Sequence, residues 1–202
     1  MPLGIKIRRE TGAYWGQCLE RGMEDGIDCG LDVILTVDYD TVFSLQNVVD
    51  LVDILVRRPE IDAIASLQVG RGGLRPLITQ KNASGSPKLI MKAAEVKEET
   101  CPVSTAHFGL TMIRTKALLR MAHPWFQGEP DRDGRWGDSR VDPDIYFWKK
   151  WEKTGNTLHL ANRIVIGHAE GGVILWPDKK FDTMYQLTRD YYDHGKPAEA
   201  WE

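Results

Sequence analysis

The stretch of sequence that decides the fold class reads Val33-Ile34-Leu35-Thr36-Val37-Asp38-Tyr39-Asp40. Its first five residues form a short, β-branched and almost continuously apolar run, which is typical of a strand buried on both faces of a parallel sheet. Two carboxylates follow directly. Side chains two residues apart on an extended backbone point the same way, so Asp38 and Asp40 are expected to face one site.

Two anions at the end of a strand repel each other unless a cation neutralises them. A hard divalent ion held by carboxylate oxygens and a substrate diphosphate is the natural partner, and open α/β sheets bind ligands beyond the carboxyl ends of their strands. The alternative is that Asp38 and Asp40 only form a turn and cap the next helix. A DxD pattern is frequent by chance, so its position after a buried strand is what favours a metal.

The rest of the chain alternates helical and strand-like segments, which predicts one α/β domain over residues 1–202. Apolar spacing and caps predict helices at Tyr14–Met23, 45–57 after the Ser44 cap, Lys116–Met121, 143–154 and Phe181–Tyr192. Strands are expected at 32–37, 61–69, 108–113 and 158–166, and loops at 70–73 and 82–87. Residues 127–141, rich in Gly, Asp and Arg, predict a mobile loop, and residues from about 178 to 202 predict a helical tail.

Composition excludes several classes of function. A net charge of −3 gives no electrostatic footprint for nucleic acid. No apolar run approaches the roughly 18 residues that span a bilayer, and the start of the chain has no secretory apolar region, so a cytoplasmic protein is expected. Cys18, Cys29 and Cys101 match neither a disulfide framework nor a zinc motif, which predicts free thiols.

Asp142-Pro143-Asp144 predicts the start of a helix, with Asp142 at the N-cap and proline at the first helical position. Asp142 is most simply a cap. Asp144 falls in the first turn, where the helix dipole stabilises its anion, so it is expected to be ionised at neutral pH, as a general base must be. Acids in a first turn are also common for stability alone.

Two histidines are further candidates. His168 follows a predicted strand, and a histidine at the end of a strand beside carboxylates can ligate a metal, favouring Mn²⁺ over Mg²⁺. A lone histidine is more often structural. His107 lies at the start of another predicted strand and is a weaker candidate for touching substrate.

Taken in order, these features resemble the GT-A glycosyltransferases, especially the inverting group related to the family-two enzymes. Residues 33–40 resemble that family's strand and DxD motif, and residues 105–114 its strand before the acceptor region, with Pro124-Trp125-Phe126 after it. The spacing from Asp144-Ile145-Tyr146-Phe147 to Gly155 resembles the family's "ED…F…G" helix, and Gly167-His168 its late metal-binding histidine. The similarity runs from about Ile5 to His168.

The resemblance implies a GT-A, Rossmann-like fold with a mixed, mainly parallel sheet flanked by helices. It implies transfer of a sugar from a nucleotide-sugar donor to a hydroxyl acceptor, with Mn²⁺ or Mg²⁺ as cofactor. Asp38 would meet the ribose or a metal-bound water, Asp40 and His168 would hold the metal, and Asp144 would take the acceptor's proton. The loop 127–141, through Trp136, would close over the donor.

Two departures from the family refine these expectations. Pro143 stands where the family often has Glu, so an expected acceptor contact is either missing or supplied by Asp142; His107 and Trp125 are further candidate acceptor contacts. Family members usually place two strand–helix units before the segment that begins here near Ile5, so the sequence predicts an N-terminally truncated fold. Such a chain is a fragment, holds the base differently, or is completed by a second copy or a partner chain.

Two other functions remain open from the sequence. One is a degenerate GT-A domain that binds metal and nucleotide without turnover. The other is a purely structural α/β domain in which Asp38, Asp40 and His168 are unrelated caps.

Overall fold

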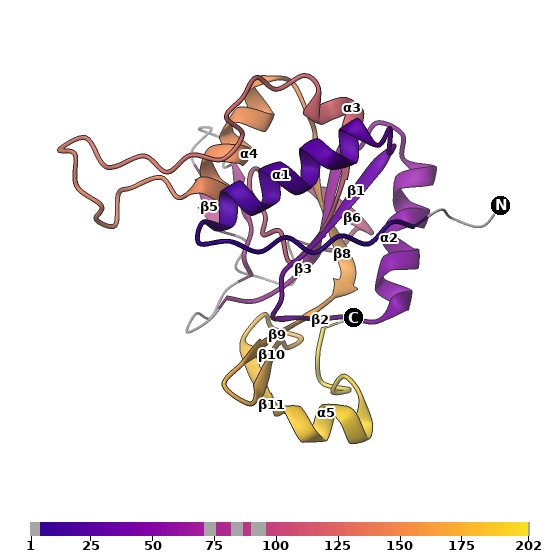
Figure 1. Cartoon of the computed structure of the whole chain (residues 1–202). Coiled ribbons are helices and arrows are strands. Elements are labelled where there is room, and N and C mark those ends of the chain that lie inside the picture. The colour runs from indigo at the N-terminus through magenta and orange to yellow at the C-terminus, as the bar shows by residue number, and fades with distance from the viewer. Residues whose placement is uncertain (1–4, 71–75, 82–86, 90–95, 202) are drawn as a thin grey trace.

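The computed structural model of the chain describes residues 5–70, 76–81, 87–89 and 96–201. The loop predicted at 82–87 lies outside the described residues except for Pro87, and so do residues 71–73 of the loop predicted at 70–73. Within this range, helices cover both faces of a central sheet, and a smaller sheet lies at one end (Figure 1). An α/β fold with a mixed sheet is therefore confirmed.

In the described part of the chain, the central sheet has five strands in the order β1-β7-β3-β8-β6. Their bounds are Val33–Val37 (β1), Leu110–Arg114 (β7), Ala63–Leu67 (β3), Leu158–Val165 (β8) and Thr100–Pro102 (β6). Among these neighbours only β3 and β8 pair in parallel. The expected mainly parallel sheet is therefore wrong, because β7 runs antiparallel between β1 and β3. These pairings still leave β1, β3 and β8 pointing the same way.

β1 is an edge strand that pairs antiparallel with β7, rather than a strand of a parallel sheet as its composition predicts. Its apolar run has a different cause, because each face of the strand meets a different helix layer. Ile34 packs into the cluster that contains Met23, whereas Val33 and Leu35 pack against the cluster that contains Leu51. A strand covered on both faces is apolar throughout, whatever the direction of its neighbours.

The first helix, α1 (Trp15–Asp28), is longer than the predicted Tyr14–Met23. Gly26 lies within this helix, where α1 packs closely on β1: a Cβ at this position would lie 2.7 Å from the Ile34 side chain. On the other face, α2 (Leu45–Arg57) begins as predicted, with Ser44 accepting from the Asn47 backbone N–H in a capping box. The other helices are α3 (Thr115–Leu118), α4 (Pro143–Lys153) and α5 (Thr188–His194).

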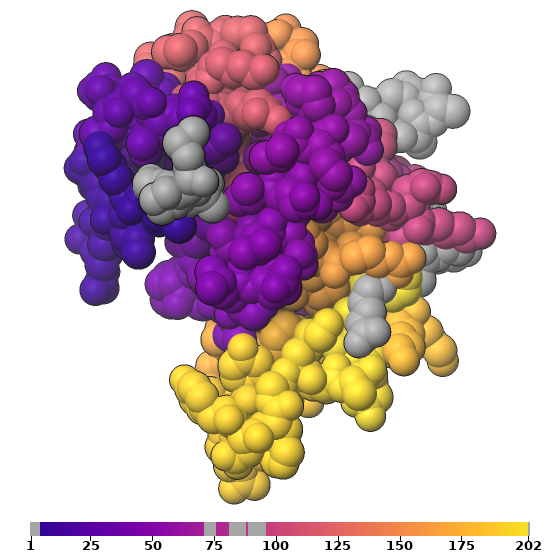
Figure 2. All heavy atoms as spheres, turned by 90° about the vertical axis from the view of Figure 1, so that its right-hand side faces the viewer, coloured from indigo at the N-terminus to yellow at the C-terminus, as the bar shows by residue number. Residues whose placement is uncertain are grey.

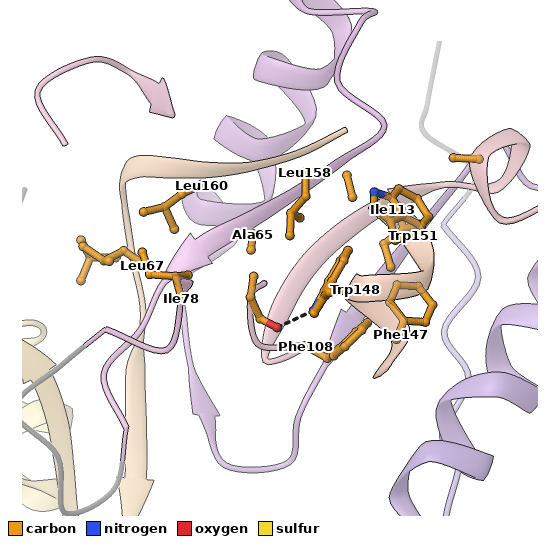
Figure 3. Packing of buried hydrophobic residues seen from close by; sticks show 14 of the residues in the cluster. Ala65, Leu67, Ile78, Phe108, Ile113, Phe147, Trp148, Trp151, Leu158 and Leu160 are labelled. Carbon is orange, nitrogen blue, oxygen red and sulfur yellow. Dashed lines mark hydrogen bonds between the residues drawn. The ribbon is translucent and has the colours of Figure 1, made fainter. Parts of the chain in front are cut away.

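The main core lies between the sheet and the helices α1 and α4 (Figure 3). An aromatic cluster fills it: Phe108 stacks on Trp148 at 5.0 Å between ring centroids and meets Phe147 edge-on at 5.2 Å. The Trp148 indole N–H donates to the Ala106 carbonyl at 2.6 Å, which satisfies its polar atom inside the core. This packing fixes α4 against the start of β7.

The second sheet has the order β11-β10-β9-β2. Its strands are Thr183–Leu187 (β11), Val173–Pro177 (β10), Gly167–Glu170 (β9) and Thr41–Val42 (β2); β4 (Thr79–Lys81) and β5 (Pro87–Leu89) form a separate pair. The helix predicted at Phe181–Tyr192 is wrong, because Thr183–Leu187 pairs with β10 before α5 begins. The C-terminal residues form a lobe beside the main body (Figure 2).

The segment between α3 and α4 projects from the body (Figure 1). Glu129 and Val141 exchange two backbone hydrogen bonds at its base, of 2.9 and 2.8 Å, and Asp131 caps the turn near its end. We call residues 127–141 the arm. Its mobility stays a prediction.

Two further expectations concern the whole chain. The three cysteines are free, as predicted. Among the described residues, no helix is long and apolar enough to cross a membrane.

Candidate functional site

Four of the site residues predicted from the sequence lie near the edge of the central sheet that is formed by the carboxyl ends of its strands: Asp38, Asp40, His107 and His168. Because β1, β3 and β8 point the same way, their carboxyl ends share this edge. Asp38 follows β1, Gln68 follows β3, and His168 lies just beyond β8. His107 reaches the same edge from the start of antiparallel β7, where it bonds to the Ser66 carbonyl of β3. Ligands of open α/β sheets bind at such an edge.

Asp40 and His168 lie side by side, although 128 residues separate them. The pairing of β2 with β9 sets Thr41 opposite His168, and the Ala169 N–H donates to the Asp40 carbonyl at 2.8 Å. The Asp40 Oδ2 and His168 Nε2 atoms are 3.3 Å apart, and the two side chains are only 12% and 10% exposed. The backbone thus holds a carboxylate and an imidazole together in a sheltered place.

The hydrogen bond of the other His168 ring nitrogen, Nδ1, determines which tautomer of the ring faces Asp40. His168 Nδ1 lies 3.1 Å from the Val69 carbonyl oxygen, which can only accept, so Nδ1 carries a hydrogen. In the neutral ring, Nε2 then presents a lone pair to the Asp40 carboxylate. The contact therefore needs either a second proton on the ring or a cation between the two atoms. With a second proton the contact is an ordinary ion pair. Two ligands bonded at about 2.1 Å and near right angles lie about 3 Å apart, so the same spacing also fits a divalent metal.

Asp38 faces a different partner from Asp40. The Trp15 indole N–H donates to Asp38 Oδ1 at 3.3 Å, and the Asp38 N–H donates to the Gly109 carbonyl. The expectation that both carboxylates point the same way fails, because the chain leaves the extended conformation after Val37 and turns at Tyr39–Asp40. In the described residues, Asp38, Asp40 and His168 are not among the groups with three ligand atoms within 4.8 Å of one another.

His107 supports this edge from inside. Its Nδ1 accepts from the Gly109 N–H at 2.9 Å, which places the ring hydrogen on Nε2, and this donates to the Ser66 carbonyl at 2.8 Å. Burial lowers the pKa of His107 to about 4, outweighing the Ser66 bond, so the ring is neutral at physiological pH. With both nitrogens engaged and 8% of its surface exposed, His107 acts as a support for Gly109 rather than the predicted acceptor contact.

Asp144 lies in the first turn of α4. Asp142 occupies the N-cap as predicted, but its side chain makes no capping bond and pairs with Arg140 at 2.8 Å. Asp144 Oδ1 accepts from the Ile145 N–H at 2.8 Å. Burial raises the pKa of Asp144, and the charge of Asp142 acts in the same direction, whereas the sequence argument expected the helix dipole to dominate.

The two tryptophans predicted to meet ligands are placed very differently. Trp125 is 2% exposed, stacks on His123 and donates its indole N–H to the Met121 carbonyl. It belongs to the core, so the predicted acceptor contact is wrong for this residue. Trp136 is 64% exposed on the arm, where its ring lies over Gly128.

A second carboxylate–histidine group lies on α1 and on the segment after α3. Glu20, Glu24 and His123 place three ligand atoms within 4.8 Å of one another. The Glu20 carboxylate accepts from the Trp125 and Phe126 backbone N–H groups at 3.0 and 3.3 Å, and its Oε1 lies 2.7 Å from His123 Nδ1. The lone pairs of the Glu20 carboxylate are thus already used to accept from backbone N–H groups that follow His123–Pro124.

Sequence reasoning missed two residues at the sheet edge. Trp15 begins α1 and is bonded to Asp38, but nothing in its local sequence signals a partner 23 residues away. Gln68 donates to the Gly167 carbonyl at 3.4 Å and lies beside Gly109 together with Thr41 and His107. A polar residue directly after the fully buried run of β3 was the one available signal for Gln68.

Comparison with known proteins supports the fold alone. No protein-family model and no curated protein sequence matches the chain. A197 from STIV, whose crystal structure is known, is similar in structure, with a TM-score of 0.58 and 13% sequence identity over 87% of this chain and 76% of A197. The fold and the site together define an α/β protein with a mixed sheet and a sheltered carboxylate–histidine pair at the sheet edge.

Proposed function

We propose that this protein is a metal-dependent glycosyltransferase of the GT-A type, which moves a sugar from a nucleotide-sugar donor to a hydroxyl acceptor with inversion. The observation that carries the proposal is the Asp40–His168 pair, in which a carboxylate oxygen faces an imidazole nitrogen whose tautomer suits a metal ligand. Asp38 at the end of β1 and Asp144 at the start of α4 supply the other expected functional groups.

In this proposal Asp40 and His168 hold Mn²⁺ or Mg²⁺, which would stabilise the growing charge of the leaving diphosphate. Asp38, held by Trp15, would orient the ribose or a metal-bound water. Asp144 accepts the proton of the acceptor hydroxyl, whose oxygen bonds to the anomeric carbon while the bond from that carbon to the diphosphate breaks. A pKa raised by burial makes the Asp144 carboxylate a stronger base than an exposed one.

A second candidate is a degenerate domain that binds metal and nucleotide without turnover. The separation of Asp38 from the Asp40–His168 pair favours it, because Asp38 is held by an indole rather than beside the two metal-ligand candidates. The two functions share the metal site and differ only in chemistry at Asp144.

Calorimetry with Mn²⁺ and nucleoside diphosphates, beside a transfer assay over a panel of nucleotide sugars, tests the proposal. Asp40→Ala should abolish Mn²⁺-dependent nucleotide binding, whereas Asp193→Ala, an exposed aspartate on α5, should leave it unchanged. Asp144→Asn should keep binding and lose transfer. Transfer by Asp144→Asn would show that the base is wrongly assigned, and binding without any transfer by the wild type would favour the degenerate domain.

A further inference from the structure

Trp15 stands out because it is a partly exposed tryptophan tied to a candidate site residue. It is the first residue of α1, and its indole N–H donates to Asp38 Oδ1 at 3.3 Å. The residue is 41% exposed, so much of it meets solvent beside that carboxylate. A tryptophan whose polar atom is bonded and whose surface stays open is suited to bind a ligand that is itself partly apolar.

The orientation of the Trp15 ring is fixed by its neighbours. It meets Phe108 edge-on at 5.5 Å between centroids and Phe126 at 5.6 Å, with interplanar angles of 72° and 84°. Phe126 stacks in turn on Phe147 of α4 at 4.7 Å. With the bond to Asp38, three contacts hold the indole in place, so a ligand would lose little free energy in ordering it.

Trp15 also lies in the part of α1 that approaches the start of α4. The start of α1 abuts the start of α4, because a Cβ on Gly16 would lie 2.8 Å from Phe126 and 3.6 Å from Pro143. Asp144 follows Pro143 directly, and Asp38 is bonded to the Trp15 ring itself. Trp15 thus links the end of β1, through its bond to Asp38, with the part of α1 that packs near the start of α4.

We infer that Trp15 is a stacking platform for a hexose ring at this site. A pyranose has an apolar C–H face that packs on an aromatic ring and hydroxyl groups at its rim, for which the adjacent Asp38 is an acceptor. The inference rests on the proposed function and names its sugar subsite. The hexose comes from the donor or from a sugar acceptor, and the two sources share the stacking chemistry.

The test compares nucleotides with and without a sugar. With Mn²⁺ present, calorimetry gives affinities of wild type, Trp15→Phe and Trp15→Ala for UDP and UDP-glucose, GDP and GDP-mannose, and dTDP and dTDP-glucose. Trp15→Ala should weaken binding of the preferred nucleotide sugar about tenfold relative to its nucleoside diphosphate, the upper range for one aromatic contact. Trp15→Phe keeps an aromatic face, loses the Asp38 bond and should retain most of this difference.

A second experiment shows whether the hexose belongs to the donor or to the acceptor. Saturation-transfer NMR with methyl hexopyranosides should show ring contacts that vanish in Trp15→Ala if the platform takes the acceptor sugar. Trp201→Phe is the matched control, since Trp201 packs on Phe181 and on Arg163 of β8, and it should change neither measurement. Urea unfolding of each variant reports whether it folds.

Two outcomes overturn the inference in distinguishable ways. If the wild type binds Mn²⁺ and a nucleoside diphosphate, but Trp15→Ala weakens sugar-bearing and sugar-free nucleotides equally and no hexopyranoside contact depends on Trp15, the platform is wrong and the proposed metal–nucleotide site stands. If the wild type binds no nucleotide and no hexopyranoside, both the platform and the proposed function fall.

Discussion

Two carboxylate–histidine groups among the described residues have different surroundings. Glu20, Glu24 and His123 lie closest together, yet Glu20 already accepts from the Trp125 and Phe126 backbone N–H groups. The Asp40–His168 group has only two members. In the neutral ring, the lone pair of His168 Nε2 faces the lone pairs of Asp40 Oδ2, so the contact needs a proton or a cation between these two atoms. Crowding of possible ligand atoms therefore does not distinguish a structural carboxylate from a proposed metal ligand, because Glu20 is already engaged by the backbone.

The largest expected effect separates the two groups directly. If the proposed metal site is correct, His168→Gln should weaken Mn²⁺ binding by about 100-fold or more, because it removes a proposed ligand, whereas His123→Gln should change it less than about twofold. Titration of Mn²⁺ followed by electron paramagnetic resonance measures both affinities. A loss confined to His123→Gln would reverse the assignment of the two groups.

His107 is a neighbour of His168, and burial keeps its ring neutral. It therefore shows what a histidine without a carboxylate partner does at this place. Its pKa of about 4 lies below the ordinary 6.5, so the unfolded chain takes up this proton first as the pH falls. Stability should therefore drop between about pH 6.5 and pH 4, by roughly 3 kcal/mol from this group. Urea unfolding across this range should show a shallower decline for His107→Asn than for the wild type; equal slopes would contradict the assignment.

We expect the group of Glu20, Glu24 and His123 to stabilise the fold rather than to bind a metal. Glu20→Ala should lower the free energy of unfolding by about 2 kcal/mol, since two partly buried backbone N–H groups lose their acceptor. Glu24→Ala, whose side chain is 45% exposed, should cost less than about 0.5 kcal/mol. Urea unfolding measures both, and Mn²⁺ binding should stay unchanged in either variant. A large loss of Mn²⁺ affinity without a loss of stability would mark a metal site here instead.

The smallest effect concerns Asp144. Because burial raises its pKa, the ionised carboxylate costs stability above that pKa, and the neutral amide of Asp144→Asn does not. The variant should be slightly more stable than the wild type at neutral pH, and the difference should vanish as the pH falls below the ordinary range of aspartate. Thermal unfolding at pH 7 and pH 3 checks the sign. A less stable variant at pH 7 would mean that the charge is stabilised, as the helix dipole alone would predict.

Local chemistry made much of the fold predictable. Ser44 caps α2 through its own hydroxyl, and Pro143 begins α4, as the sequence indicates. Gly155 follows the end of α4 with a φ of 75°, a conformation that glycine adopts without strain. These signals act within one helical turn, so no distant residue is needed to read them.

Where distant contacts decided the outcome, sequence reasoning failed. The tail was predicted as a helix, but Thr183–Leu187 pairs with β10, and the Trp176 indole bonds to Gln186. Trp125 was a candidate for ligand contact, and only the packing around Met121 and His123 shows that it is in the core. Backbone pairing and burial override local preference in such places.

By itself, the sequence determined the α/β class, the ends of the capped helices and the identity of the candidate ligands, because these depend on the nearest residues. The tertiary structure alone decided that β7 separates β1 from β3, that Asp38 turns toward Trp15, and that Asp40 meets His168. Each of these contacts joins segments far apart in the chain. No short window of sequence records such a contact, since its free energy comes from packing that exists only when the whole sheet has formed.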